Sequence, residues 1–220
     1  MTALISSILF VGVIGGFIPV AAWMSKKALD QGLRVERLDF YLETVIIQTL
    51  LVALALWAGR SNDVSLTLSP AASMEVFLGG LGLTIAALAA LVIGWRMSSE
   101  DRKERLRMIV PFSRSERLAW VGVSLTAGVA EEVIYRGVLF GLLYVWTGHF
   151  WIAAVLASIV FGFAHLVQGW VAVTIVFAYG LLFQMLYEAS GSLFTVILVH
   201  FTYDLLAGFT IARWSRHEEM

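Results

Sequence analysis

Three ionisable residues, Glu131, Glu132 and Arg136, lie in a stretch of chain that is otherwise apolar and long enough to cross a membrane. Ionisable groups at such depth are costly unless paired or hydrated, which makes them functional candidates. Residues four apart share a helix face, so Glu132 and Arg136 can pair. Glu131 projects about a quarter turn away and is left free to activate water. The alternative is that all three form a structural network.

Two histidines on later apolar segments each have a notable neighbour four residues away. Phe161 precedes His165, and Asp204 follows His200. A single histidine on an apolar helix is more often a satisfied polar group than a ligand, but a second histidine beside a carboxylate suits metal binding or proton transfer. Together with Glu131, these residues match a site that polarises a carbonyl and activates water.

The depth of His165 is left open by the sequence. It lies a few residues from the turn near residues 168–169, whereas Glu131 and His200 fall near the middle of their segments. Either the helix of His165 lies deeper than its apolar limits indicate, or the site opens toward the cytoplasm.

The composition is that of a membrane protein. Of the 220 residues, 60% are hydrophobic and 14% charged, against about 25% charged in soluble domains. The absence of cysteine excludes disulfides, a thiol nucleophile and thiolate-bound metals. No basic patch is interleaved with aromatic residues, so we expect no nucleic acid partner.

The apolar pattern predicts an all-α polytopic membrane helix bundle of about seven transmembrane helices, forming one domain over residues 1–220. Because its apolar stretch is long enough to span a bilayer, the first segment is expected to be a retained helix rather than a signal peptide. The hydrophilic stretch from Arg96 to Arg117 is expected to be a loop. The seven segments are 3–24, 39–59, 73–96, 117–146, 150–167, 170–188 and 192–212.

The distribution of basic residues predicts the orientation. With the N-terminus outside, all of the 15 Lys and Arg residues except Arg60 and Arg136 fall in cytoplasmic loops or the C-terminal tail. Such asymmetry follows the positive-inside rule. We therefore expect the N-terminus outside and the C-terminus in the cytoplasm.

The motifs of several intramembrane proteases are missing from the sequence. There is no His-Glu-x-x-His, which disfavours a zinc protease of the site-2 type, and no Gly-x-Ser-Gly, which disfavours a rhomboid protease. Tyr203-Asp204 is half of a presenilin-like aspartyl site, but the partner Gly-x-Gly-Asp is missing.

The motifs that are present, in order, are Glu131-Glu132-x-x-x-Arg136, Phe161-x-x-x-His165 and His200-x-x-x-Asp204. This pattern resembles the CAAX protease and bacteriocin-processing family (CPBP, or Abi), which includes the type II CAAX prenyl endopeptidases. The resemblance covers roughly residues 113–212, as a catalytic core, and residues 1–112 carry no motif.

The resemblance implies an intramembrane endopeptidase. Glu131 would activate the attacking water, and His165 and His200 would bind a metal or stabilise the oxyanion. Whether such proteins use zinc, held by Glu131, His165 and His200, or act without metal stays open. The supporting roles that the resemblance assigns to other residues are these: Glu132 and Arg136 support the acidic helix, Phe161 supports His165, and Asp204, often Asn in the family, ligates a cation or orients His200.

The resemblance also implies the setting of the protein. The compact chain is similar to bacterial members in the cytoplasmic (inner) membrane, surrounded by lipid and acting on peptides, small membrane proteins or lipidated substrates. A second hypothesis is a non-proteolytic scaffold or bacteriocin-immunity protein of the same fold. A third, a proton-coupled carrier, is disfavoured because Pro19, Pro70 and Pro111 lie outside the motif helices.

Overall fold

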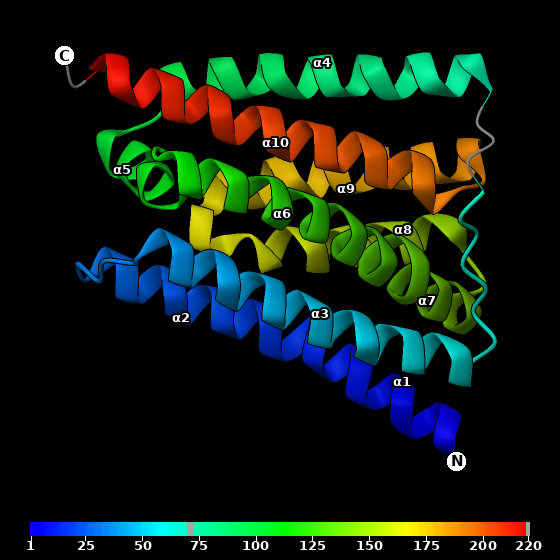
Figure 1. Cartoon of the computed structure of the whole chain (residues 1–220). Coiled ribbons are helices and arrows are strands. Elements are labelled where there is room, and N and C mark those ends of the chain that lie inside the picture. The colour runs from blue at the N-terminus through cyan, green and yellow to red at the C-terminus, as the bar shows by residue number, and fades with distance from the viewer. Residues whose placement is uncertain (70–72, 219–220) are drawn as a thin grey trace.

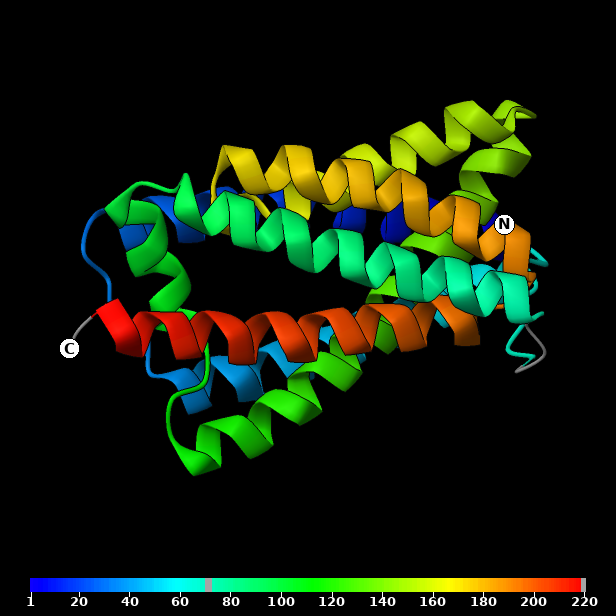
Figure 2. The same ribbon diagram turned by 90° about the horizontal axis from the view of Figure 1, so that it is seen from above.

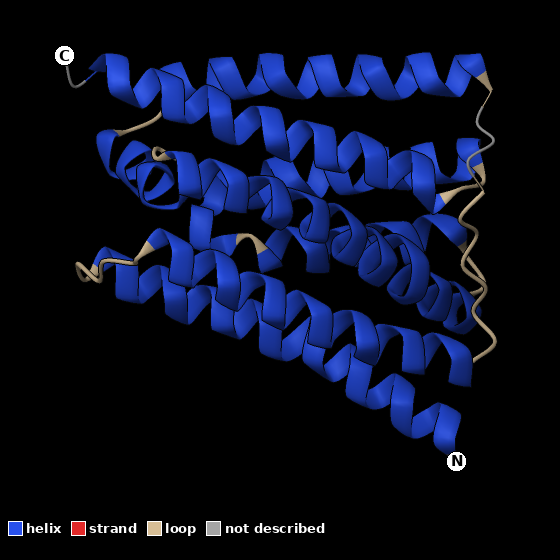
Figure 3. Cartoon of the chain, viewed as in Figure 1, coloured by secondary structure: helices blue, strands red, loops and turns tan. Residues whose placement is uncertain are grey.

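The computed structural model describes residues 1–69 and 73–218, and all regular secondary structure in these residues is helical (Figure 3). Pro70 lies outside the described residues. The helices, with the π-helical segments η1 and η2 and the 3₁₀ turn η3, are α1 (Thr2–Gly12), η1 (Val13–Phe17), α2 (Ile18–Asp30), α3 (Arg37–Ser61), α4 (Met74–Arg96), α5 (Glu100–Ile109), α6 (Arg114–Glu131), η2 (Glu132–Leu139), α7 (Phe140–Thr147), α8 (Phe150–Ala164), η3 (Leu166–Gln168), α9 (Trp170–Ser190) and α10 (Leu193–Glu218).

The helices are those of an integral membrane protein. In the described residues, six segments are long and apolar enough to span a bilayer, and α8, with 15 residues, is a shorter apolar helix. Large apolar side chains on the outside of the bundle, such as Leu50 and Ile8, are more than half exposed, as expected where lipid is the solvent. The predicted all-α bundle is confirmed, while the count of seven crossings stays a prediction.

The helices form a layered bundle (Figures 1 and 2). Helices α1 to α3 form one side, α4 lies on the opposite side, and α6, α8, α9 and α10 lie between them. The two chain ends lie at opposite ends of the bundle, and α5 lies at the same end as the C-terminus (Figure 1). Arg105 of α5 forms an ion pair of 3.0 Å with Asp30, the last residue of α2. The loop that follows α2, the first predicted cytoplasmic loop, therefore lies at the same end of the bundle. The basic segments therefore gather at one end, as the charge pattern requires.

One expectation about the polar connection between residues 96 and 117 was wrong. It contains the helix α5, which begins directly after Ser99. Leu106 and Ile109 of this helix face a cavity inside the bundle and are partly buried by tertiary packing. Because α5 is short and mostly charged, its sequence has too few apolar residues to show a helical pattern, and a loop was expected.

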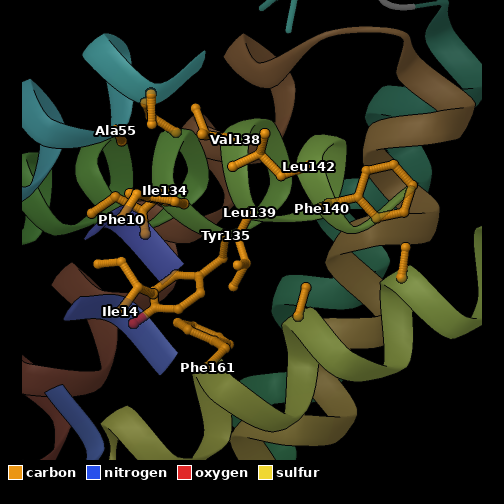
Figure 4. Close-up of a cluster of buried hydrophobic side chains, with 14 of the residues drawn as sticks. Phe10, Ile14, Ala55, Ile134, Tyr135, Val138, Leu139, Phe140, Leu142 and Phe161 are labelled. Carbon is orange, nitrogen blue, oxygen red and sulfur yellow. The ribbon is translucent and has the colours of Figure 1, made fainter. Parts of the chain in front are cut away.

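The central helix runs from α6 through η2 into α7. It begins at a capping box in which Ser113 Oγ accepts from the Glu116 amide, while the Glu116 carboxylate accepts from the Ser113 amide. All eight residues of η2 are buried. Their apolar members, with Phe10 of α1 and Phe161 of α8, form the main core of the protein (Figure 4).

Glycines bring the neighbouring helices close to this centre. A Cβ atom at Gly128 of α6 would lie 3.1 Å from the backbone nitrogen of Phe201 in α10, and one at Gly162 of α8 would lie 2.8 Å from the carbonyl oxygen of Val173 in α9. Contacts between helix backbones at this range leave no room for a side chain. Gly128 and Gly162 thus set the spacing of helices that carry the motif residues.

Candidate active site

A cavity of about 270 Å³ lies inside the bundle, and most of its wall is apolar. Helices α3, α4, α5, α6, α8, α9 and α10 contribute to it. The polar motif residues at the wall are Glu131, His165, His200 and Asp204. Residues more than 70 positions apart in the sequence therefore meet at one concave, partly open site, which is the usual form of a small-molecule or peptide site.

The two adjacent glutamates have different surroundings. The Glu131 side chain lies on the cavity wall and is 18% exposed, whereas the Glu132 side chain is completely buried. Glu131 is the last residue of α6 and Glu132 begins the π-helical segment η2. π-Helical turns occur often at functional sites because the wider turn redirects neighbouring side chains.

Glu132 is the centre of a buried polar network. Its Oε1 accepts from Arg136 Nη1 at 3.0 Å and lies 2.6 Å from His200 Nδ1. The ion pair expected from the spacing of Glu132 and Arg136 is present. The Arg136 guanidinium also lies over the rings of Phe161 and Phe183, 4.2 and 5.2 Å from their centroids, where cation–π attraction stabilises it further.

His200 is held between three carboxylates. The carboxylate of Glu132 can only accept a hydrogen bond, so the hydrogen of this contact belongs to Nδ1. The opposite ring nitrogen, Nε2, lies 3.7 Å from Glu131 Oε2 and 3.5 Å from Asp204 Oδ2. The buried network thus fixes the orientation of the ring and presents Nε2 to the cavity.

His165 lies at a different kind of position from the one expected. The apolar segment 150–167 predicts that His165 is inside a helix, but α8 ends at Ala164 and the 3₁₀ turn η3 follows. Gly169, with a φ of 97°, then reverses the chain into α9. This turn lies inside the bundle, short of the end formed by α5 (Figures 1 and 2). Both alternatives for the depth of His165 stay predictions.

The turn presents His165 to the same carboxylate as His200. His165 Nδ1 lies 2.9 Å from the carbonyl oxygen of Phe161, which can only accept, so Nδ1 carries the hydrogen. Nε2 lies 3.8 Å from Glu131 Oε2. Both histidines therefore direct Nε2 toward one oxygen of Glu131.

Phe161 joins the two halves of this arrangement. Its ring lies 4.8 Å from the His165 ring and 4.8 Å from the Tyr135 ring (centroid distances), and it stacks under Arg136. Figure 4 shows Phe161 beside Tyr135 in the core. Phe161 thus couples the position of His165 to the acidic helix, as expected for a supporting residue.

Asp204 lies at the more open edge of the cluster. Its side chain is 28% exposed, and its Oδ2 contacts the His200 ring from the next turn of α10. Trp120 of α6 donates to the backbone oxygen of Asp204 at 3.2 Å, which holds this turn against α6.

One comparison with known protein families bears on these motifs. Residues 113–206 match the model for type II CAAX prenyl endopeptidase, Rce1-like. This segment is Rce1-like. The match confirms the resemblance indicated by the three motifs, and it supports membrane-embedded peptidase activity in general. No curated protein and no solved structure matches the chain.

One residue of the site lies outside the Rce1-like segment. Gln48 of α3 lines the cavity and donates from Nε2 to Glu131 Oε1 at 3.5 Å, a long hydrogen bond. The buried Gln48 Oε1 has no partner. Sequence reasoning missed this residue, because a single polar residue in an apolar segment has no partner at a fixed spacing. A glutamine in the middle of a predicted membrane helix is the one signal that marks it.

The predicted metal ligands do not form a metal site in the described part of the chain. Glu131 Oε2 lies 3.8 and 3.7 Å from the two Nε2 atoms and has no hydrogen-bond partner. However, no group of three or more His, Cys, Asp or Glu residues among those described is arranged to hold a metal ion. The zinc site therefore stays a prediction, and no step below passes through a metal.

Proposed function

We propose that this protein is an intramembrane endopeptidase that cleaves peptides or small membrane proteins by glutamate-activated water. The observation that carries the proposal is the orphan oxygen of Glu131. It is buried, faces the Nε2 atoms of both His165 and His200, and opens on the cavity. A water bound there has a carboxylate to accept its proton and two imidazoles around it.

The proposed reaction uses each of these groups in turn. Glu131 takes a proton from water while the resulting hydroxide attacks the scissile carbonyl carbon. His165 and His200, when protonated at Nε2, donate to the oxyanion of the tetrahedral intermediate. Glu131 then returns the proton to the leaving amine. Adding water across the peptide bond in this way yields one carboxylate product and one amine product.

The buried residues prepare the site for this reaction. Glu132 fixes the ring orientation of His200, and Arg136 compensates the charge of Glu132. Asp204 faces Nε2 of His200 from the open side, where we propose that it orients the ring. These contacts keep the donors in place before substrate binds, which is the main source of electrostatic catalysis.

The proposed setting is the bacterial cytoplasmic membrane. The apolar outer surface fits lipid, and the largely apolar cavity fits a membrane-associated or lipidated peptide. The proposal takes the basic end of the bundle to be the cytoplasmic end.

The test is peptide cleavage by the purified protein in liposomes. Wild type, Glu131→Gln and Glu131→Asp would be incubated with a prenylated CAAX peptide and a library of membrane peptides, with and without a zinc chelator. We expect cleavage by wild type, none by Glu131→Gln, and no effect of the chelator. Loss of cleavage with the chelator would require the metal-assisted form of the reaction. Absence of cleavage by well-folded wild type would favour the scaffold or immunity function.

A further inference from the structure

The cavity extends from the reactive cluster to α5, which lies at the C-terminal end of the bundle (Figure 2). On α10 its wall runs from Val199 to Ile211. At 1.5 Å per residue this is a length of about 18 Å. About five residues of extended peptide cover that length. The cavity therefore offers a path for substrate residues between the reactive cluster and α5.

One face of α5 forms the wall at this end. Arg102, Leu106 and Ile109, which share a helix face, all line the cavity. Leu106 and Ile109 continue the apolar wall. Arg102 is the charged residue that α5, described in full, contributes to the cavity.

The other basic side chains of α5 have carboxylate partners. These pairs are Lys103 with Glu100 at 3.0 Å, Arg105 with Asp30 at 3.0 Å, and Arg107 with Glu100 and Glu104 at 3.6 Å. Arg102 differs from all of them. It forms no ion pair with any residue in the described ranges 1–69 and 73–218. Its Nε, like that of Arg105, is buried without a hydrogen-bond partner among these residues.

The surroundings of Arg102 favour an anion beside it. Burial, and then the positive charge of Arg105, lower the pKa of the Arg102 guanidinium below its ordinary value. A bound anion would offset both effects. Leaving a partly buried cation without a partner is costly, so a ligand that pairs with it gains correspondingly.

We propose that Arg102 binds a carboxylate of the peptide substrate, at the end of the cavity remote from Glu131. A guanidinium binds a carboxylate through two parallel hydrogen bonds, with both charge and geometry matched. The carboxylate belongs to the free C-terminus of the substrate or to an acidic side chain near it. This inference rests on the proposed peptidase function and makes Arg102 a specificity-determining residue of the same cavity.

The test compares two forms of one peptide. The peptide that wild type cleaves fastest in the library would be made with a C-terminal carboxylate and with a C-terminal carboxamide, and the carboxamide form also with Glu as the last residue. We expect wild type to cleave one of the carboxylate peptides about tenfold or more faster, in kcat/KM, than the plain carboxamide. Arg102→Gln should reduce this ratio to about one, through KM.

The matched control is Arg105→Gln, since Arg105 lies on the same helix but is paired with Asp30. It should keep the wild-type ratio, and loss of the ratio in both variants would indicate a general charge effect and overturn the proposal. Equal cleavage of all three peptides by wild type would overturn it as well. Should Arg102→Gln fail to fold, Arg102→Met replaces it, and a ratio unchanged by that substitution counts against the proposal.

A binding measurement separates this inference from the peptidase proposal. The carboxylate and carboxamide peptides, labelled at the N-terminus, would be titrated into Glu131→Gln and into Glu131→Gln/Arg102→Gln in detergent. Selective binding of the carboxylate form to the first protein alone supports the role of Arg102 even where no cleavage is seen. Equal affinity of the two proteins for both forms contradicts it.

Discussion

The acidic helix carries two adjacent glutamates in different surroundings: Glu131 lies on its cavity face and Glu132 on its buried face. On the cavity face, Glu131 has one long hydrogen bond to Gln48 and an unpartnered oxygen beside two imidazoles. On the buried face, Glu132 binds Arg136 and His200 through Oε1 and is closed to solvent. Its Oε2 also lacks a partner among the described residues, but it faces neither imidazole Nε2. The comparison shows that adjacent, identical side chains receive different surroundings from the helices packed against each face. The proposed function assigns reaction to Glu131, and orientation and charge balance to Glu132.

The sharpest test of this division compares Glu131→Gln with Glu132→Gln. We expect Glu131→Gln to lower kcat by about 10² to 10⁴-fold, the range for loss of a general base, with an unchanged melting temperature. Glu132→Gln should lower both, because Arg136 and His200 lose the carboxylate between them. Cleavage rates and thermal melting of the detergent-solubilised proteins measure the two effects. Equal destabilisation by both substitutions would contradict the division.

A second test removes the buried cation. Arg136→Met should lower the free energy of unfolding by about 3 to 5 kcal/mol, because it leaves Glu132 buried without its counter-charge. The double variant Glu132→Gln/Arg136→Met should regain part of that loss, since neither charge remains. Thermal melting followed by tryptophan fluorescence provides the measurement. Normal yield and melting of Arg136→Met would show that the pair is not what stabilises this face.

A third test displaces His165 without touching the site. In Gly162→Ala the new Cβ would lie 2.8 Å from the carbonyl oxygen of Val173, so α8 must move away from α9. We expect a loss of about 1 to 3 kcal/mol in stability, typical of overpacking, together with reduced cleavage. Gly82→Ala is the matched control, because nothing lies within 4 Å of a Cβ there. Similar behaviour of the two variants would contradict close packing of α8 and α9.

The smallest effect on cleavage is expected from a substitution of Gln48, the residue of α3 that contacts Glu131. Gln48→Leu removes the long hydrogen bond to Glu131 and should reduce kcat about tenfold, near the 1.4 kcal/mol of one typical hydrogen bond. Thr49→Val serves as the control, since that hydroxyl bonds only within its own helix, to Val45. A normal rate in Gln48→Leu would show that Glu131 is positioned without help from outside the Rce1-like segment.

The contacts that the sequence spacing predicted are those between two residues of the same helix. Residues four apart share a face wherever the chain is helical, so the contacts of Glu132 with Arg136 and of His200 with Asp204 could be predicted without knowing the fold. Three motifs in order were enough to indicate the resemblance that the match of residues 113–206 confirms for that segment. The catalytic roles of these residues stay predictions.

Contacts between elements could not be predicted in this way. Gln48 reaches Glu131 across 83 positions of sequence, and Arg102 reaches the cavity because α5 folds against the bundle. Neither contact follows from local periodicity, since both depend on how the helices pack. The end of α8 before His165 was missed for a related reason: the apolar pattern continues through the turn, because the turn itself is enclosed.

The sequence by itself determined that this is an all-α membrane protein, because lipid solvent and helical periodicity leave few alternatives for an apolar chain. It also indicated the candidate site residues, whose catalytic roles stay predictions. Only the tertiary structure decided what each side chain does. It directed Glu131 to the cavity and Glu132 to the core, turned both imidazoles toward one oxygen, and left Arg102 unpaired at the far wall. Burial and partners, which set the reactivity of an ionisable group, are properties of the packed bundle and not of the local sequence.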